Sequence, residues 1–489
     1  MNLNFRGISR VIAILFHMLG VAMLPSALVG FIYCETKMTI VFIALGAALF
    51  LIGKLMWRFI EPSMVMFKIR DGLLVVFFCW IICGLVGALP YIFSDCAGSV
   101  VNAVFESYSG FTTTGATIFS DVEILPHSLL FWRSFSQWLG GFGVVLIPIA
   151  VLPRLGIEGS VIVRAEMSGT LVNRVAPKLS DTARRMFFIF SFWTLLETVL
   201  LMIGGLSLFN ALTHSFTTMS TGGFTNYNDN LGHFGSTYVY CVFSFFMLIA
   251  GIDVTTQAKL FAGKIMEVVK DAELRYYLFF FAASTALIVV YLTASGYEAP
   301  TFRGFAKSAF HVLSTLSTAG FYEAEFDFWP LFPKMILLLL MFVGGCISST
   351  SGGIKVFRAI VFLKLIKRGV LVRLHPSAVV DMKVGGKKIS SSVGSAVTGF
   401  IFLYVALVAL GTALLTLSGV DNPTSFVSVL ACIGNIGPAL SIGGSSLQYS
   451  IFSDPIKLLL CLYMLAGRLE LTAVIVMFSR HFWNPDLSR

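Results

Sequence analysis

Four short segments that join glycine to small, mostly polar residues recur along this chain, each directly after an apolar stretch. Glycine accepts positive φ angles and a close approach of other backbone, and a ring of inward-pointing carbonyl groups needs both if it is to replace the hydration shell of an ion. The four glycine segments therefore predict a selectivity filter for a cation. The predicted ion-binding residues of glycine segments 1 to 4 are Thr113, Thr114 and Gly115; Thr221, Gly222 and Gly223; Thr318, Ala319 and Gly320; and Asn435, Ile436 and Gly437.

The segments share more than glycine when they are aligned on their final glycine. Two residues earlier, three segments have threonine and the fourth has Asn435. Nine residues earlier stand Glu106, His214, His311 and Ser428, so the two histidines occupy equivalent places. Small residues alone are weak evidence because they also serve close helix packing in membranes. The common register, however, indicates a fourfold internal repeat.

The composition places these segments in a membrane. The chain has 489 residues, of which 57% are hydrophobic and only 12% are charged, and its mean hydropathy is +0.88. Hydrophobic runs recur throughout, which leaves no stretch with the polar surface of a separate soluble domain. The opening apolar stretch, 11–33, is too long and too poor in cleavage-site residues for a secretory signal. We expect it to be the first membrane span.

The net charge of +9 comes from basic residues whose distribution along the chain indicates the membrane topology. Because the charge is explained in this way, nucleic acid is not expected as a partner. Basic residues gather in a few connections, whereas the connections between them are almost free of lysine and arginine and carry acidic residues instead. The positive-inside rule places the basic connections and both chain termini in the cytoplasm. The basic groups lie at 6–10, 54–70, 154–185, 259–275, 355–388 and 480–489.

About ten membrane spans of roughly 20 residues fit between these charged zones. Four further apolar stretches are too short to cross a bilayer and are predicted to be re-entrant half-helices, each leading into one glycine segment. Irregular backbone at membrane depth is tolerated only inside protein or beside a water-filled cavity, so the four segments are expected to converge on one axis. The half-helices are predicted at 99–112, 208–220, 303–317 and 423–434, and the spans at 11–33, 39–60, 71–93, 127–152, 186–208, 236–258, 276–296, 332–358, 396–418 and 455–479.

The unit of span, half-helix, glycine segment and span divides the chain into four tandem repeats of an all-α polytopic membrane fold. A two-helix N-terminal extension precedes the repeats. The predicted boundaries are 1–66 for the extension and 67–152, 153–262, 263–370 and 371–489 for repeats 1 to 4.

The eighth predicted span, 332–358, is interrupted by residues that do not favour a helix. Its 344–353 segment contains only small or flexible residues apart from Cys346 and Ile347, and it lies near the middle of the bilayer. A kinked helix facing lipid is the alternative, but it would leave too many backbone groups unsatisfied, so we expect a gating loop that lines the pore. The predicted gating residues of this segment are Gly344, Gly345, Ser348, Ser349, Thr350, Ser351, Gly352 and Gly353.

Arg468 lies at a comparable depth in the last predicted span. An arginine inside a membrane is costly and by default functional. A structural ion pair with Glu470 is the alternative, but residues two apart on a helix do not face each other. We therefore expect Arg468 to act in gating, either by raising the barrier to cations below the filter or by attracting the dipoles of the 344–353 segment.

Together these motifs resemble the Trk/Ktr/HKT superfamily of potassium uptake proteins over essentially the whole chain, and most closely its bacterial TrkH family. The resemblance rests on the four glycine segments, the 344–353 segment and Gly467-Arg468-Leu469-Glu470. It implies potassium uptake across the bacterial inner membrane through a channel-like, pseudo-four-fold pore that two extra helices precede. It also implies a homodimer with one pore per protomer. The fourth glycine segment departs from the pattern, with Asn435 in place of threonine and Pro438 after its glycine.

The resemblance further implies control by a cytoplasmic TrkA-like ring that binds a nucleotide, ATP/ADP or NAD, so that potassium is the only ion or cofactor expected on this chain. The basic connection 355–388 continues directly from the 344–353 segment. We expect it to contact anionic membrane lipid or a cytoplasmic partner, and its position favours a partner that pulls on the gate.

Two other classes of function were weighed against a pore. A membrane-embedded enzyme would need a nucleophile with its base or a metal set such as His-Glu-x-x-His, neither of which the sequence contains, so no enzymatic activity is expected. A proton- or sodium-coupled potassium symporter also uses broken helices at mid-membrane and stays open as the alternative. Four filter segments favour a pore, with potassium preferred over sodium because glycine in all four keeps four carbonyl rings available.

Several polar residues inside the predicted spans and half-helices have two interpretations. His214 and His311 suggest a metal site or a proton relay, but their equivalent places favour packing or hydrogen bonds behind the filter. Glu106, in the same column, is expected near the outer mouth, where an acid concentrates cations. Glu197 and Asp253 either couple protons or bond neighbouring helices. The eight cysteines have no metal-type spacing.

Overall fold

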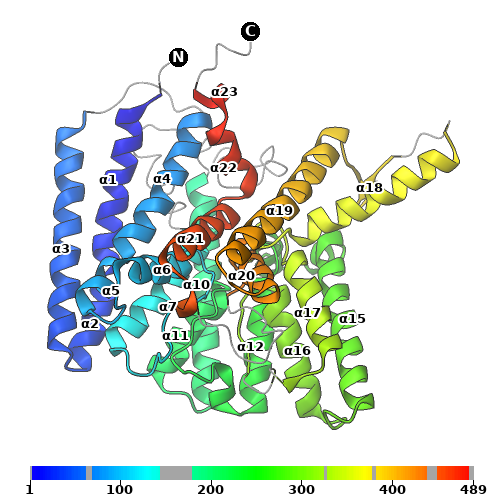
Figure 1. Cartoon of the computed structure of the whole chain (residues 1–489), viewed down its shortest axis with the longest axis horizontal. Helices are drawn as coiled ribbons and strands as arrows, with labels where there is room; N and C mark the ends of the chain where they lie inside the picture. The colour runs from blue at the N-terminus through cyan, green and yellow to red at the C-terminus, as the bar shows by residue number, and fades with distance from the viewer. Residues whose placement is uncertain are drawn as a thin grey trace.

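The fold is almost entirely helical (Figure 1). The computed structural model describes residues 3–61, 69–143, 179–323, 326, 328–376, 381–437 and 449–483. Within these residues the only sheet is an antiparallel hairpin of β1 (Lys383–Val384) and β2 (Lys387–Lys388). Six helical segments of the described chain are long and apolar enough to cross a membrane, and a bent pair adds a seventh if it is counted as one span. The chain is an integral membrane protein.

Three helices form the N-terminal part: α1 (Phe5–Ala22), α2 (Leu24–Ile32) and α3 (Thr36–Phe59). The first predicted span, 11–33, corresponds to α1 and α2, which a single turn residue, Met23, separates. Helices α1 and α3 approach closely at two glycines, because a Cβ atom on Gly20 would lie 2.7 Å from the carbonyl oxygen of Gly46. Small residues at such crossings let helix backbones meet in a membrane.

Four groups of helices follow, and each contains a short helix of 12 to 15 residues that leads into a glycine segment. These short helices are α6 (Val100–Phe111), α11 (Leu208–Met219), α16 (Phe302–Leu316) and α20 (Asn422–Gly434). Before them stand α4 (Ile69–Gly87) with α5 (Leu89–Ser94), α10 (Leu179–Ile203), α15 (Ala272–Ala294) and α19 (Ser391–Leu417). After them stand α7 (His127–Phe142), η3 (Leu231–Phe234) with α12 (Thr237–Ala250), α17 (Leu331–Val343), and η5 (Tyr449–Ile451) with α21 (Asp454–Arg468).

The remaining helices connect these groups or end the chain. They are α13 (Val254–Phe261), α14 (Ile265–Val269), α18 (Val356–Leu374), α22 (Leu471–Phe478) and α23 (Arg480–Trp483). In Figure 1, α18 projects from the body of the molecule, and both chain termini lie at the same end.

Two predicted spans are wrong as continuous helices. In the region of 236–258, α12 ends at Ala250 and α13 turns away by 104°, because Asp253 starts a new helix by accepting a hydrogen bond from the amide of Thr255 at 3.0 Å. In the region of 455–479, α21 ends at Arg468, and Glu470 has a φ of 58° before α22 begins. Neither break contains a proline, so the sequence contains no signal that these helices end there.

Other predictions correspond to irregular backbone or to residues beyond the described part. The predicted interruption of span 332–358 lies between α17 and α18. The end of the fourth predicted span, 144–152, lies outside the described residues, as do 154–178 of the basic group 154–185 and Pro438.

Candidate cation site

Each of the four short helices begins at a side-chain cap and points its C-terminal end at a glycine segment. The capping residues of α6, α11, α16 and α20 are Ser99, Ser207, Thr301 and Asp421, and each accepts a hydrogen bond from the third amide of its helix. Such caps satisfy amides that a helix leaves unpaired and fix where it starts. Because a helix carries partial negative charge at its C-terminus, the four ends favour a cation at the glycine segments.

The backbone of the glycine segments alternates between ordinary and left-handed conformations. The final glycines 115, 223, 320 and 437 have φ angles of 79°, 76°, 76° and 91°. Two residues earlier, φ is again positive, at 55°, 56° and 61° for Thr113, Thr221 and Thr318 and 50° for Asn435. Positive φ is unusual for β-branched threonine, so contacts with the surrounding protein must impose this conformation. Positive φ at alternate residues turns the intervening carbonyl groups to one side of the chain.

The glycine segments pack directly against one another. A Cβ atom on Gly115 would lie 1.9 Å from the carbonyl oxygen of Gly222, and one on Gly223 would lie 2.1 Å from that of Ala319. A Cβ atom on Gly437 would lie 2.5 Å from the carbonyl oxygen of Thr114. In each contact, the carbonyl before the final glycine of one segment lies against the final glycine of its neighbour. The four segments therefore meet in the order 4, 1, 2, 3, with no room for side chains at these glycines.

Side chains from neighbouring helices hold the segments in place. The amide of Gln137 on α7 bridges segment 2, because its Nε2 donates to Gly222 O at 2.8 Å and its Oε1 accepts from the Phe224 amide at 3.2 Å. In segment 4, Asn435 Nδ2 donates to Thr114 Oγ1 and to Met464 O, both at 3.0 Å. Asparagine at this position thus ties segment 4 to segment 1 and to α21, which threonine is too short to do.

The interpretation of Glu106 as an acid that concentrates cations near the outer mouth is wrong, because its charge is paired inside the protein. Its side chain is fully buried and forms an ion pair with Arg133, with 2.9 Å between Arg133 Nε and Glu106 Oε1. Sequence reasoning missed Arg133, although a signal existed: it is the one basic residue in the predicted span 127–152 and Glu106 is the one acid among the four aligned positions.

The two histidines of the aligned column are buried in packing contacts. Nδ1 of His214 lies 2.8 Å from Asn210 O one turn earlier on α11. The ring of His311 lies 4.8 Å from the rings of both Phe326 and Trp329, measured between centroids. Within the described residues, no group of three or more His, Cys, Asp or Glu side chains is placed to hold a metal ion. These contacts favour the packing interpretation over a metal site.

The 344–353 segment is irregular backbone that lies against the ends of three of the short helices. The amide of Gly352 donates to Thr318 Oγ1 in glycine segment 3 at 2.8 Å. A Cβ atom on Gly352 would lie 2.0 Å from Gly434 O, at the end of α20. Thr350 Oγ1 donates to Met219 O, at the end of α11, at 3.2 Å. The segment therefore lies directly beside the glycine segments rather than facing away from them.

Other contacts tie the 344–353 segment to the surrounding helices. The amide of Cys346 donates to Gly251 O at 2.9 Å, at the break between α12 and α13. The amide of Ile347 donates to Glu273 Oε1 on α15 at 2.7 Å. Val356, the first residue of α18, donates its amide hydrogen to Gly345 O at 2.9 Å. The segment is therefore connected by a backbone hydrogen bond to the projecting helix α18.

Arg468 joins this segment to α7. Its Nη1 donates to Thr350 O at 2.7 Å, and its Nη2 donates to Gly140 O at 2.7 Å and to Gly141 O at 3.3 Å. The helix break after Arg468 turns Glu470 toward Arg358 on α18, with 2.6 Å between Arg358 Nη2 and Glu470 Oε2.

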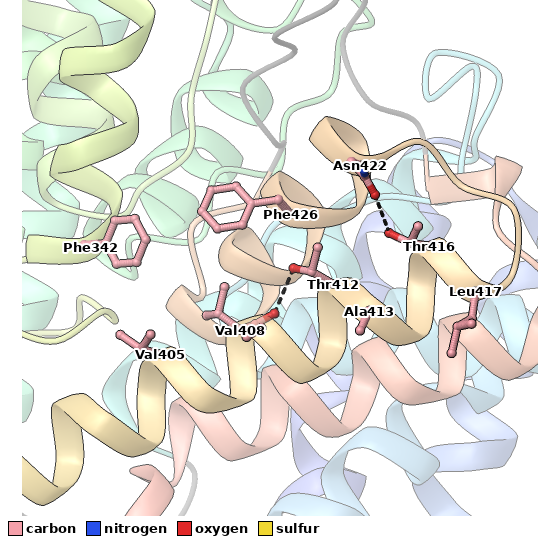
Figure 2. A pocket seen from close by; sticks show the side chains of 10 residues that line it. Phe342, Val405, Val408, Thr412, Ala413, Thr416, Leu417, Asn422 and Phe426 are labelled. Atoms are coloured by element: carbon pink, nitrogen blue, oxygen red, sulfur yellow. Dashed lines mark hydrogen bonds between the residues drawn. The ribbon is translucent and has the colours of Figure 1, made fainter.

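Two cavities near these helices differ in chemistry. A cavity of about 180 Å³ is lined by residues 348–353, by the charged side chains of Arg468 and Glu470, and by aromatic side chains such as Trp80 and Phe142. A larger cavity of about 690 Å³ lies between α17, α19 and α20 (Figure 2), where Phe342 and Phe426 lie on one side and Val405 and Val408 on α19. The hydroxyls in its lining are satisfied internally: Thr412 donates to Val408 O at 2.8 Å and Thr416 to Asn422 Oδ1 at 3.0 Å. The lining of this cavity is mostly apolar, so it is a poor site for an ion.

Comparison with known proteins gives a consistent result. The family model TrkH, described as "Cation transport protein", matches residues 38–485. The chain is 34% identical to the Trk system potassium uptake protein TrkH of Halomonas elongata, over 99% of this chain and 100% of that protein. It is 32% identical to TrkH of Escherichia coli K12 with the same coverage. Its structure is similar to the crystal structure of the potassium transporter TrkH from Vibrio parahaemolyticus, with a TM-score of 0.89, 31% identity and coverage of 99% of this chain and 100% of that one.

Proposed function

Because the chain belongs to the TrkH family of cation transport proteins, we propose that it takes up potassium through one pore lined by the four glycine segments. The observation that carries this proposal is the set of contacts in which the carbonyl before one final glycine lies against the glycine of the next segment. These contacts place carbonyl oxygens of segments 1, 2 and 3 at the junctions between neighbouring segments. We infer that the carbonyl groups of all four segments face one axis and take the place of water around a potassium ion. The four helix C-termini behind them add favourable partial charge.

The proposal includes a pseudo-four-fold architecture with an N-terminal extension over 1–66 and repeats at 67–152, 153–262, 263–370 and 371–489. Four equivalent caps and four pairs of positive φ angles support it. We place the protein in the bacterial inner membrane with both termini in the cytoplasm. Both termini lie at the same end of the molecule, which supports placing them on the same side of the membrane (Figure 1); the positive-inside rule assigns that side to the cytoplasm.

In the same proposal the 344–353 segment and Arg468 form the gate. The segment adjoins glycine segment 3 and the start of segment 4, so an ion that leaves the filter meets it directly. Arg468 holds the segment to α7 through Thr350 O and Gly140 O and adds a positive charge on the same path. A cation therefore meets a steric plug and an unfavourable charge together.

The proposal also includes three partners: a second copy of this chain in a homodimer, membrane lipid, and a cytoplasmic TrkA-like ring. The ring carries the nucleotide, ATP/ADP or NAD, and moves the gate. Helix α18 links the gate to such a ring, because Val356 bonds to Gly345 O and the helix projects from the body (Figure 1). We expect photo-crosslinkers placed at Lys364 and Lys388 to capture the regulator in cell membranes. A crosslinker at Tyr297, in the acidic connection before α16, serves as the control. Capture at Tyr297 alone, with none at the two lysines, would contradict this route.

A proton- or sodium-coupled symporter is the second candidate function, and Glu197 on α10 favours it. This carboxyl group is fully buried, and the Thr218 side chain on α11 lies beside it. Coupling through Glu197 requires that potassium uptake depend on a proton gradient and that Glu197→Gln remove this dependence.

Potassium flux into liposomes tests the two functions directly. With purified protein and a potassium gradient alone, a pore carries potassium down its gradient until the opposing membrane potential balances it. A proton or sodium gradient changes this flux only through the membrane potential. A symporter gives flux that stops when the coupling ion is at equilibrium. We expect the first result, and potassium flux that requires a proton or sodium gradient would contradict the pore.

A further inference from the structure

Arg133 on α7 occupies a fully buried position between glycine segments 1 and 2. Its Nη1 donates to Thr225 O at 3.0 Å, two residues after the final glycine of segment 2. Its Nη2 donates to Thr117 Oγ1 at 3.2 Å, two residues after the final glycine of segment 1. One guanidinium group therefore contacts equivalent positions of two neighbouring segments.

Glu106 on α6 completes this arrangement. Its Oε1 accepts from Arg133 Nε at 2.9 Å, and its Oε2 accepts from the amide of Ile118 at 3.0 Å. Thr117 Oγ1 lies 3.0 and 3.1 Å from the two carboxylate oxygens. The carboxylate thus holds the loop that follows segment 1. The guanidinium joins this loop to the loop that follows segment 2.

The ring of Phe224, which directly follows glycine segment 2, covers the guanidinium, with 4.1 Å between Arg133 Cζ and the ring centroid. A planar guanidinium suits this site, because it stacks on an aromatic face while its nitrogens donate in fixed directions. The adjacent carboxylate balances its charge, so the pair adds little net charge near the pore.

The other three repeats do not contain this pair. The residues aligned with Arg133 are Cys241, Leu338 and Pro455, and those aligned with Glu106 are His214, His311 and Ser428. The junction of segments 2 and 3 uses a different contact, in which the backbone of Asn230 pairs with that of Glu323. Repeat 3 has a different buried pair, between Lys307 on α16 and Glu323, three residues after its final glycine, with 3.0 Å between Lys307 Nζ and Glu323 Oε1.

We propose that Arg133, held by Glu106, is a positioning residue that sets the spacing of glycine segments 1 and 2 and thereby the preference for potassium over sodium. This inference rests on the proposed function. A carbonyl cage that discriminates against the smaller sodium ion must resist contraction around it, and the gap at this junction is bridged by a rigid fork of three hydrogen bonds. Loss of the fork lets segments 1 and 2 approach each other and coordinate sodium.

Two variants separate positioning from charge and from folding. Arg133→Lys keeps a positive charge beside Glu106 but lacks the planar fork that reaches Thr117 and Thr225 together. The double variant Glu106→Gln, Arg133→Gln removes both charges, so that neither remains buried and unpaired, and a buried pair replaced as a unit is tolerated far better than one broken pair. We expect both to conduct potassium with the ratio of sodium to potassium flux raised about tenfold, which corresponds to the loss of one charge-assisted hydrogen bond.

The matched control is the partly buried pair of Arg358 and Glu470, which lies beside the 344–353 segment rather than between glycine segments. Its double variant Arg358→Gln, Glu470→Gln is expected to change the total flux but to leave the sodium-to-potassium ratio at the wild-type value. This control distinguishes a specific effect on selectivity from a general effect of removing a buried ion pair.

The measurement is the flux of each ion into liposomes that contain full-length protein, after a single symmetric peak in size-exclusion chromatography shows intact folding. A wild-type ratio in Arg133→Lys and in the double glutamine variant overturns the inference, and should Arg133→Lys fail to fold, the double variant decides. A wild-type protein that carries no potassium refutes the proposed function instead, so the two failures are distinguishable.

Discussion

Replacement of Gly223 by serine is expected to raise the ratio of sodium to potassium flux by about tenfold or more and to lower potassium flux. The new Cβ atom would lie 2.1 Å from the carbonyl oxygen of Ala319, so glycine segments 2 and 3 must separate. Serine is also disfavoured at the φ of 76° that Gly223 adopts, at a cost of about 1 to 2 kcal/mol. Gly320→Ser meets the same backbone restriction, because Gly320 also has a φ of 76°. The measurement is potassium and sodium uptake by proteoliposomes.

Gly296→Ser is the matched control for this experiment. Gly296 has a φ of 72°, close to that of Gly223, but no atom lies within 4 Å of a Cβ atom built on it. The control therefore introduces the same backbone strain without the steric contact and is expected to retain wild-type selectivity. Wild-type discrimination in Gly223→Ser and Gly320→Ser, with normal folding, would refute selection by the carbonyl groups of these segments.

The half-helices and glycine segments were predictable because their determinants are local. An apolar stretch too short to span a bilayer, followed by glycine in a fixed register, is visible in one sequence. The positive φ of Thr113 was not predictable, since threonine avoids it and only the surrounding contacts impose it. The same holds for Asn435, whose amide bonds to Thr114 Oγ1, a residue 321 positions away.

The ion-pair partners of the buried charged residues could not be predicted from the sequence either. The sequence placed Arg468 at mid-membrane depth by counting along a helix, and that count assumed a continuous span. The structure breaks the helix after Arg468, which brings Glu470 to Arg358, 112 residues away. Glu106 on α6 and Arg133 on α7 lie on different helices and meet only when these two helices pack together. Depth can be counted along a sequence, but the partner of a buried charge depends on tertiary packing.

Removal of the Arg468 side chain is expected to produce the largest change in basal flux. Arg468→Ala eliminates the hydrogen bonds to Thr350 O and Gly140 O, each 2.7 Å long and charge-assisted. If these bonds form only when the 344–353 segment closes the pore, their loss lowers the stability of the closed state by about 3 kcal/mol. That change corresponds to roughly a hundredfold shift toward the open state. Potassium flux in liposomes without any regulator should rise accordingly, up to the limit of full opening.

A second variant reaches the same state by a different physical route. Gly352→Ala places a methyl group 2.0 Å from Gly434 O and thus forces the 344–353 segment away from α20 without altering any charge. Gly369→Ala on α18 is its control, because no atom lies within 4 Å of a Cβ atom there, and we expect wild-type basal flux. Arg468→Ala removes the hydrogen bonds that hold the 344–353 segment, whereas Gly352→Ala displaces the segment. Raised flux in both variants therefore indicates that the segment itself is the barrier. Unchanged or lower flux in both, with folding intact, would refute the gate while leaving the glycine segments as the filter.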